Sequence, residues 1–426
     1  MDTWERQLGA DHPATLDARR GLAVVMRRQG ELPAARKLLE DVYPRQKRLL
    51  GPANPQTLAS MTKLADVLYD LGQFEDARNL YEEEIEVRKR AGLAKQRRTF
   101  AAMGNLATVH IQQNKLDDAA RLLEECPALQ KANLPPEDRD TLTCMNNLAL
   151  VWWKQKKLSE ARKLHEEVLG IRRRLYGDQH ADTLRSMNNL FMVLMDQAEW
   201  EAARKLMQEL IAGSIQVNGP DHPATTVSAM KALGKVVSLQ AAELKSKGLP
   251  EEEAKLHRDV LDFLKTLEPT CANMPQYQAQ LAATHNHLAW LLANGPDEKQ
   301  RDPAAAVEHG NKAVVAAEKF GRDKLLQGSC YSTLGTAHYR AGDGKAAGAA
   351  FEKALPLRNG GDGYDYFFLA MVHWQLGDKK AAADWHKKGM EWMEKNKALL
   401  EKNKTADTEL RRIRAEADKL LGVNEK

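Results

Sequence analysis

Residues 177–190 read Gly-Asp-Gln-His-Ala-Asp-Thr-Leu-Arg-Ser-Met-Asn-Asn-Leu, and parts of this pattern return along the chain at a fixed step. One threonine recurs every 42 residues without slippage, and the residue after it is Leu in four of the six cases. We call residues that share one position in successive repeats a column. The threonine column consists of Thr15, Thr57, Thr99, Thr141, Thr183 and Thr225. A fixed period of this length indicates a repeat architecture.

Other columns keep the same step and indicate what one repeat contains. Apolar residues within each repeat follow helical spacing, and a break falls in register at Gly30, Gly72, Asn114 and Lys156. Each repeat is therefore predicted to be two helices joined by a tight turn, with small alanines where the helices cross. The leucine and alanine columns are Leu22, Leu64, Leu106, Leu148 and Leu190; Ala23, Ala65, Ala107 and Ala149; and Ala35, Ala77, Ala119, Ala161 and Ala203.

The composition agrees with a helical chain and narrows the classes of function. Hydrophobic residues make up 43% of the 426 residues and charged residues 29%, which excludes a wholly disordered chain. Aromatic residues are only 6% and β-branched residues are sparse, so we expect an all-α fold. Lys and Arg number 63 against 59 Asp and Glu, a balance too even to make nucleic acid the default partner.

No stretch of the sequence predicts a membrane span or an export signal. The longest uncharged apolar runs, such as Leu148 to Trp153, fall far short of the roughly 18 to 20 residues that cross a bilayer. Residues 1–6 hold acids and Trp4 where a signal peptide needs bases and an apolar run. The four cysteines are 18 or more residues apart and fit neither a zinc motif nor a dense disulfide framework. We expect a cytoplasmic protein.

Three short motifs together carry a family resemblance. The pattern Gly-x-x-His-Pro-x-Thr, then Asn-Asn-Leu-Ala, then Ala-Arg-x-Leu resembles the 42-residue tetratricopeptide repeat of kinesin light chains and their bacterial relatives. Gly177 to Leu190 and Met145 to Leu164 match best, and the resemblance covers about residues 1–268. It implies an α-α superhelix of about nine helix pairs. The array starts mid-repeat, and Leu233-Gly234 replaces Leu-Ala in its last, degraded unit.

The repeat changes after Pro269. Gly342 to Gly377 and Ala347 to Ala382 are steps of 35 residues, close to the ordinary tetratricopeptide spacing. We therefore divide the chain into residues 1–268, an ordinary repeat array at 269–394 with an inserted loop at 295–303, and a charged linker with a capping helix at 395–426. The expected apolar face of that capping helix is Leu410, Ile413, Ala417, Leu420 and Leu421.

A second resemblance concerns residues 275–426. The segments 288–293, 301–303, 366–371 and 373–377 are similar to the tetratricopeptide tails of bacterial multidomain serine/threonine kinases. This resemblance implies an alternative function, a regulatory or substrate-recruiting tail of a larger enzyme that is truncated at Met1.

The chain lacks the sequence motifs of common enzymes. It has no kinase glycine-rich loop with His-Arg-Asp and Asp-Phe-Gly, no phosphate-binding Gly-x-x-x-x-Gly-Lys, no Gly-x-Ser-x-Gly and no His-Glu-x-x-His. His285 and His287 are two residues apart on one predicted helix, so they face different sides and are not expected to share a metal. We expect no catalytic residue, no metal site and no cofactor.

The first helices of such repeats line the concave side of a superhelix, where residues not needed for packing are available to partners. Asparagine is unfavourable inside a helix, so its repetition at Asn105, Asn147 and Asn189 needs a reason. An amide has two donors and an acceptor, enough to hold a peptide backbone, but hydrogen bonds between neighbouring repeats would also explain it. The expected groove residues are Arg20, Lys63, Asn105, Asn146, Asn147, Trp153, Lys154, Arg185, Asn188 and Asn189.

Basic residues gather at or just after the ends of second helices, where the helix dipole favours them. They would also form a positive ridge able to attract an acidic peptide, with nucleic acid as the lesser candidate. The members are Arg45, Lys47, Arg48, Arg88, Lys89, Arg90, Lys95, Arg97, Arg98 and Arg172 to Arg174.

Taken together, these features predict a non-catalytic scaffold for protein–protein interaction. It would bind peptides or partner segments, acidic ones included, in the concave groove, with asparagines on the main chain and Trp153 as an apolar anchor. We expect no membrane partner.

Overall fold

The computed structural model describes residue 6 and residues 8–133 and 138–423. The side chains of residues 126–133 and 224 lie outside this description, as do the predicted features at Trp4 and Cys126. The described part of the chain forms 20 α-helices, one π-helical and one 3-10 segment, and no strand. The all-α prediction is confirmed. The helices group into two compact units, Met1–Ala198 (unit 1) and Glu199–Lys426 (unit 2).

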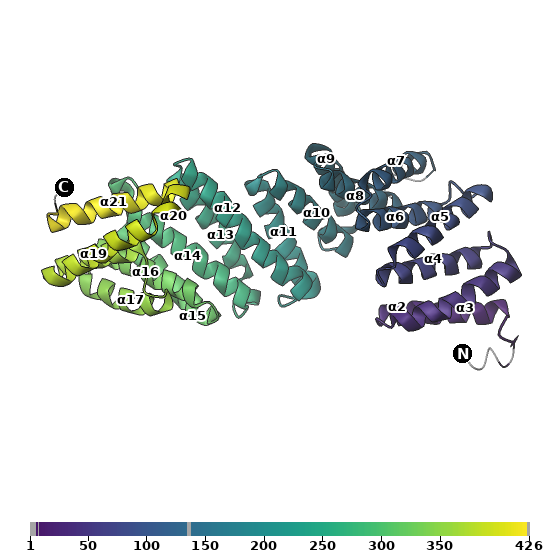
Figure 1. The fold of residues 1–426 in the computed structure, drawn as a ribbon, viewed down its shortest axis with the longest axis horizontal. Helices are drawn as coiled ribbons and strands as arrows, with labels where there is room; N and C mark the ends of the chain where they lie inside the picture. Colours follow the sequence, from purple (N-terminus) through teal and green to yellow (C-terminus); the bar gives the residue numbers. More distant parts are fainter. Residues whose placement is uncertain (1–5, 7, 134–137, 424–426) are drawn as a thin grey trace. The chain divides into compact units, whose positions relative to one another are not determined.

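Unit 1 consists of helix pairs in which each helix packs against the next along the chain (Figure 1). The even-numbered helices are the first helices of the predicted repeats, and the odd-numbered ones are the second helices. The bounds are α2 (Pro13–Arg28), α3 (Leu32–Leu50), α4 (Pro55–Asp70), α5 (Phe74–Arg90), α6 (Arg97–Gln112), α7 (Leu116–Asn133), α8 (Arg139–Lys154), α9 (Leu158–Tyr176) and α10 (Ala181–Asp196).

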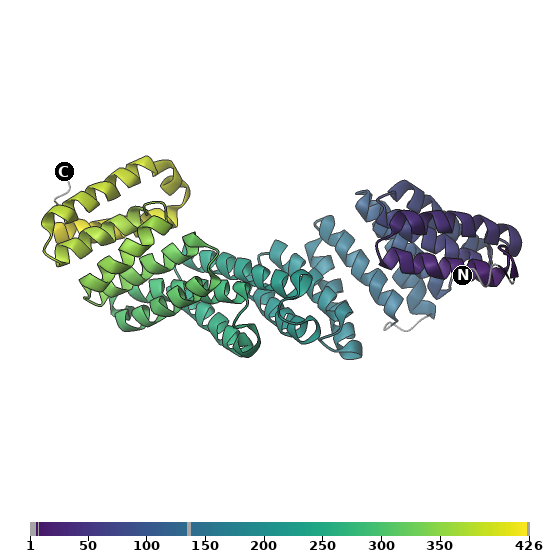
Figure 2. The same ribbon diagram turned by 90° about the horizontal axis from the view of Figure 1, so that it is seen from below.

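In unit 2, first and second helices again alternate along the chain. The unit ends with two further helices, α20 and α21, that do not belong to a repeat pair (Figure 2). In chain order, α2 to α19 make nine successive pairs, as predicted. Pro269 lies inside α13. The bounds are α11 (Trp200–Asn218), η1 (Pro223–Val227), α12 (Ser228–Ser246), α13 (Pro250–Cys271), α14 (Pro275–Asn294), η2 (Glu298–Gln300), α15 (Pro303–Phe320), α16 (Lys324–Arg340), α17 (Gly344–Leu357), α18 (Gly363–Gln375), α19 (Lys379–Lys395), α20 (Lys397–Lys402) and α21 (Lys404–Leu421).

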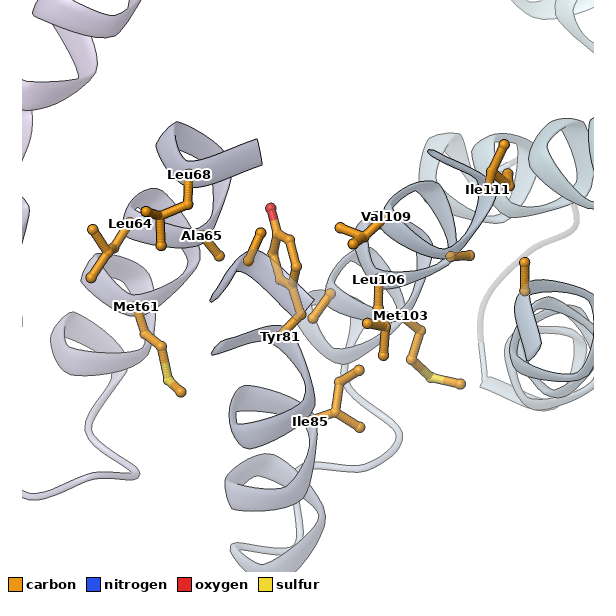
Figure 3. Packing of buried hydrophobic residues seen from close by; sticks show 14 of the residues in the cluster. Met61, Leu64, Ala65, Leu68, Tyr81, Ile85, Met103, Leu106, Val109 and Ile111 are labelled. Atoms are coloured by element: carbon orange, nitrogen blue, oxygen red, sulfur yellow. The ribbon is translucent and has the colours of Figure 1, made fainter. Parts of the chain in front are cut away.

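The alanine columns lie at buried positions between packed helices. Every alanine of the two predicted columns is fully buried. The leucines from Leu64 to Leu190 are also buried, and Figure 3 shows Leu64 and Ala65 of α4 and Leu106 of α6 on either side of Tyr81. Alanine allows close approach because only a methyl group separates the two backbones. The predicted packing columns are therefore confirmed.

The threonine column is regular in five repeats and slips by one residue in the sixth. Thr15, Thr57, Thr99, Thr141 and Thr183 are all buried, but Thr225 is only half-buried. Thr226 takes the buried place and donates to the carbonyl of Gly219 at 2.9 Å. The cause is the π-helical segment η1, which accommodates one extra residue at the start of this first helix. The 42-residue step of the sequence continues to Thr225, but the buried position of the sixth repeat is taken by Thr226.

The predicted breaks within repeats are tight turns in the left-handed backbone region. Gly30, Gly72, Asn114 and Lys156 have φ values of 84°, 75°, 58° and 63°. Glycine adopts this conformation without strain, whereas a side chain such as that of Lys156 costs about 1 kcal/mol or more.

We expect Lys156→Gly to raise the free energy of unfolding by about 0.5–1 kcal/mol, because it removes this strain. The lost pair between Lys156 Nζ and Asp196 (3.0 Å) matters little at a side chain that is 75% exposed. Urea unfolding measures the change. Gly72→Ala is the matched control and should destabilise, since no atom lies within 4 Å of the added Cβ and only strain is introduced.

One core column contains a histidine among apolar residues. The column runs Leu39, Tyr81, Leu123, His165 and Met207, and every member is buried. The His165 side chain is 1% exposed, and its Nδ1 has no hydrogen-bond partner among the described residues. Burial, with the charge of Arg172 as a smaller cause, lowers the pKa of His165 to about 4.

This pKa makes unit 1 sensitive to acid. The folded pKa lies below the ordinary value, so the unfolded chain binds a proton that the folded chain does not, and stability falls as the pH drops from about 6.5 toward 4. We expect His165→Met, which copies Met207, to reduce the loss of unfolding free energy between pH 7.5 and pH 5 by about 2 kcal/mol. His180→Asn, at an exposed helix cap, should leave the loss unchanged. Equal losses in His165→Met and the wild type would contradict this account.

Candidate functional site

The first helices of unit 1 share an exposed face. On α6, α8 and α10 the more exposed residues recur at steps of four, three and four, which places them on one side of each helix. α6 packs against α8, and α8 against α10, so these sides are neighbours. We name this surface the first-helix face. Its members are Ala101, Asn105, Thr108 and Gln112; Thr143, Asn147, Leu150 and Lys154; and Arg185, Asn189, Met192 and Asp196.

Six pairs of side chains in successive repeats, most of them on first helices, share one sequence offset. Each of the six joins a residue to one 43 positions later, which is one repeat plus one residue, while Arg27 also pairs with Asp66 at an offset of 39. This offset arises because neighbouring first helices are in contact with a small shift along their axes. The pairs are Arg27–Asp70 (2.5 Å), Tyr69–Gln112 (3.2 Å), Arg97–Asp140 (2.6 Å), Arg139–Asp182 (3.4 Å), Asn146–Asn189 (3.0 Å) and Trp153–Asp196 (3.1 Å).

Two of the predicted groove asparagines are bonded to each other. Asn189 donates from Nδ2 to Oδ1 of Asn146 at 3.0 Å. Asn146 is only 6% exposed, so its amide is a packing group between α8 and α10. For Asn189, the structure therefore shows a hydrogen bond between neighbouring repeats, which was the alternative to peptide binding.

The other predicted asparagines have amides without an intramolecular partner. Asn105 and Asn147 are half-buried and Asn188 is exposed, and none of the three makes a hydrogen bond to another described residue. Asn105 and Asn147 lie at the same position of neighbouring repeats, on α6 and α8. Sequence periodicity placed these two residues on one side of their helices, as the structure does, but did not separate them from Asn146 and Asn189.

Trp153 and Lys154 lie at the end of α8. The Trp153 indole N–H donates to Asp196 of α10 at 3.1 Å, which fixes the ring at the edge of the first-helix face. Lys154 Nζ is 5.8 Å from the centre of that ring. Arg185, at the start of α10, is exposed and 3.5 Å from Asp182.

Arg20 and Lys63, on α2 and α4, are engaged by carboxylates. Arg20 pairs with Asp17 at 2.6 Å, and Lys63 pairs with Asp66 at 2.8 Å. Asp66 also accepts from Tyr81 at 2.6 Å, so the Lys63 ammonium belongs to a network that reaches the core.

The predicted basic ridge is mostly neutralised by acids. Arg88 and Arg172 are buried and bonded to Glu84 and to Ser186. The ridge prediction was wrong for these residues, because a second-helix column turns inward at this point. Among the described residues of the set, only Lys89, Lys95 and Arg98 have neither an ion pair nor a side-chain hydrogen bond. The remaining pairs are Arg45 with Asp11 and Asp41, Lys47 with Glu83, Arg48 with Asp11, Arg90 with Glu86, Arg97 with Asp138 and Asp140, and Arg173 with Asp178.

The C-terminal helix α21 does more than cap the array. Leu410, Ile413 and Ala417 are buried, as predicted, but Leu420 is 39% exposed. A second face, beside the apolar one, carries residues that bond to other helices of unit 2. These bonds are Glu409 with Lys245 of α12 and Trp290 of α14, Arg412 with the Asn294 carbonyl, and Glu416 with Arg340 of α16. No sequence signal links Glu409 to Lys245, 164 residues earlier.

The histidines of unit 2 form two pairs. His285 Nδ1 lies 2.8 Å from His309 Nδ1, and the rings of His257 and His287 stack at 4.8 Å. His285 and His287 thus face different partners. Across the described ranges, no three His, Cys, Asp or Glu side chains are grouped as a metal site. None of the described helices is long and apolar enough to cross a membrane.

The Asn146–Asn189 bond gives a stability test of the cross-repeat offset. We expect Asn146→Ala to cost about 1 kcal/mol, because the half-buried Asn189 amide loses its acceptor. In a double-mutant cycle, the two asparagines should show a coupling energy of about 0.5–1 kcal/mol. The cycle removes the effect of each substitution on helix propensity, because that effect is the same in the single and the double variants. Asn105 and Asn189 are the matched uncoupled pair. Additive effects of Asn146→Ala and Asn189→Ala would contradict the bond.

Comparisons with solved structures find similar repeat proteins. Two crystal structures of nearly identical TPR-like repeats from Podosopora anserina, named as kinesin light chain, are 25% identical to this chain with TM-scores of 0.43. They cover 48% and 49% of this chain, and 97% and 98% of their own. BtubC (BKLC) from P. vanneervenii is 20% identical, with a TM-score of 0.40 and coverage of 58% of this chain and 92% of its own. With such TM-scores, none of these likenesses identifies a partner.

Family models give a more direct result. A model described as Tetratricopeptide repeat matches residues 1–48, 22–90 and 56–132, and a second with the same description matches 141–182 and 183–224. Together these matches span about half of the chain. A search of curated proteins gives no match. The helix pairs, the alanine crossings and these matches agree, and the chain belongs to the tetratricopeptide repeat family.

Proposed function

We propose that this chain is a non-catalytic interaction scaffold, and that it holds an extended peptide segment of a partner on the first-helix face of unit 1. Tetratricopeptide repeats are commonly protein-interaction scaffolds, which supports the general role. The assignment of the face rests on the side chains that it presents.

The observation that carries the proposal is the pair of unbonded amides at Asn105 and Asn147. Both lie inside helices, where asparagine is less favourable than alanine by about half a kcal/mol. Their neighbours are bonded across repeats, yet these two make no hydrogen bond to the described chain. An amide on each of two adjacent helices offers donors and an acceptor to the main chain of a peptide, which is independent of the peptide's side chains.

Apolar side chains lie on the same face and would supply anchor contacts. Met192 of α10 is 40% exposed, and Leu150 and Trp153 of α8 are half-buried. Flexible methionine and rigid tryptophan are both enriched at interaction surfaces. A peptide fits this arrangement if its backbone is held by the two asparagine amides and an apolar side chain lies beside it. Most basic residues of the predicted ridge are already paired with acids, so a strongly acidic peptide is not favoured.

The test uses a peptide selected on the full chain from a random library displayed on phage. We expect the double substitution Asn105→Ala and Asn147→Ala to weaken binding of the selected peptide tenfold or more, measured by fluorescence polarisation, because two charge-free hydrogen-bonding groups are lost. The unfolding free energy should stay equal or rise, since alanine is the better helix former.

Asn79→Ala is the matched control, because Asn79 is an exposed asparagine on the second helix α5 of the same unit. It should leave peptide affinity unchanged. If no peptide is selected, or if the double variant binds the selected peptide as the wild type does, the proposed function fails.

A further inference from the structure

Unit 2 contains a cavity that the scaffold role of unit 1 does not use. Its volume is about 430 Å³, and side chains from α12, α13, α14, α16, α18 and α21 border it (all but α18 are labelled in Figure 1). Glu253, Trp290, Tyr364 and Glu409 are the residues on which the argument depends. A volume of this size is within the range of small-ligand sites.

The cavity wall is acidic overall. Its basic residues are Lys245 and Arg358, against the acids Glu253, Asp362 and Glu409. Both bases already have partners. Lys245 pairs with Glu409 at 2.8 Å, and Arg358 is bonded to Asp362, Asp365 and Ser332. One carboxyl group, that of Glu253, is left over.

Glu253 is a buried acid without a partner. The residue is 6% exposed, and its carboxyl group makes no hydrogen bond or ion pair with any residue in the described part of the chain. It borders both this cavity and a second one of about 440 Å³ beside it. Burying a carboxylate without compensation is costly, so a residue of this kind is a poor choice for packing alone.

The surrounding charges explain how the acid is tolerated. Burial raises the pKa of Glu253 to about 7, the charge of Glu409 on α21 adds to the rise, and Lys245 on α12 opposes it. His287 of α14 and Tyr364 of α18 are further titratable side chains on this wall. A cation placed beside Glu253 would restore its charged form and replace the missing partner.

Aromatic rings form the wall next to these acids. Trp290 and Tyr364 are packed edge to face with their centres 5.6 Å apart. Trp290 donates from its indole N–H to Glu409 at 3.0 Å, and the Tyr364 hydroxyl donates to the Ala406 carbonyl at 2.9 Å. These bonds fix both rings, and a fixed indole offers a surface for an alkyl chain and for a cation.

We propose that this cavity binds a primary alkylammonium group, with the Glu253 carboxylate as its counter-charge and Trp290 beside its alkyl chain. A lysine side chain of a partner and a free aliphatic diamine share this chemistry. The single surplus acid matches one ammonium group, and the rings match the methylene groups that carry it.

Isothermal titration calorimetry of the full chain tests the site with two probes, 1,4-diaminobutane and Nα-acetyl-lysine N-methylamide. We expect saturable binding of at least one probe, and no binding of the lysine amide once its Nε is acetylated. Tighter binding of the diamine identifies a free amine as the ligand, and tighter binding of the lysine amide identifies a protein side chain. Saturation by neither probe, or equal binding of the acetylated amide, would overturn the proposal.

The matched variants are Glu253→Gln and Glu252→Gln, neighbours on α13 of which only the first is buried. Glu253→Gln should weaken ammonium binding about tenfold or more, and Glu252→Gln should leave it unchanged. The glutamine amide carries no charge, so we expect the Glu253→Gln variant to keep or raise its unfolding temperature, which thermal unfolding by circular dichroism verifies. Wild-type affinity in a folded Glu253→Gln protein would overturn the assignment, independently of peptide binding by unit 1.

Discussion

The close crossing of helices at alanine is the constraint on which the rest of unit 1 depends. Each crossing buries a methyl group completely, so two backbones approach with nothing larger between them. Because the crossing recurs every 42 residues, each first helix meets the next in nearly the same way. The constant offset of 43 residues in the cross-repeat bonds follows from that repetition. Any bulkier side chain at a crossing would separate the two helices. The polar side chains that are bonded between neighbouring repeats would then no longer be within hydrogen-bonding distance.

Periodicity predicted the fold because residues at the same position of successive repeats have the same burial. Ala107 and Ala149 are buried for the same reason, and Lys156 occupies a turn that glycine fills at Gly72. The same reasoning was wrong at Thr225, because a column assumes that every helix starts with the same backbone geometry. The π-helical segment η1 shifts the register by one residue. Because Thr225 and Thr226 are adjacent and identical, the sequence does not indicate which of them is buried.

The side chains of the candidate surface were harder to predict than the fold. Asn146 and Asn147 are adjacent and chemically identical, yet one is bonded between repeats and the other is not. Their difference lies in rotation about the helix axis and in the offset to the next repeat, which a single sequence does not specify. The basic ridge was mispredicted for a related reason. Opposing acids such as Asp11, in the turn before α2, and Glu83, on α5, come from other segments of the chain, so a count of charges along one helix does not include them.

Unit 2 shows how a repeat fold acquires a cavity without enzyme motifs. Its helices have the same antiparallel pairing, but α21 brings Glu409 and its neighbours onto α12, α14 and α18. These contacts join residues far apart in the sequence and do not recur from repeat to repeat, so the periodicity of the sequence does not predict them. The result is a cavity in which every charged group on the wall is paired except Glu253, among the residues the structure describes. A packing role does not account for a buried carboxyl group in that position, since an uncharged side chain of similar size would be more stable there. A ligand that supplies the missing positive charge does account for it.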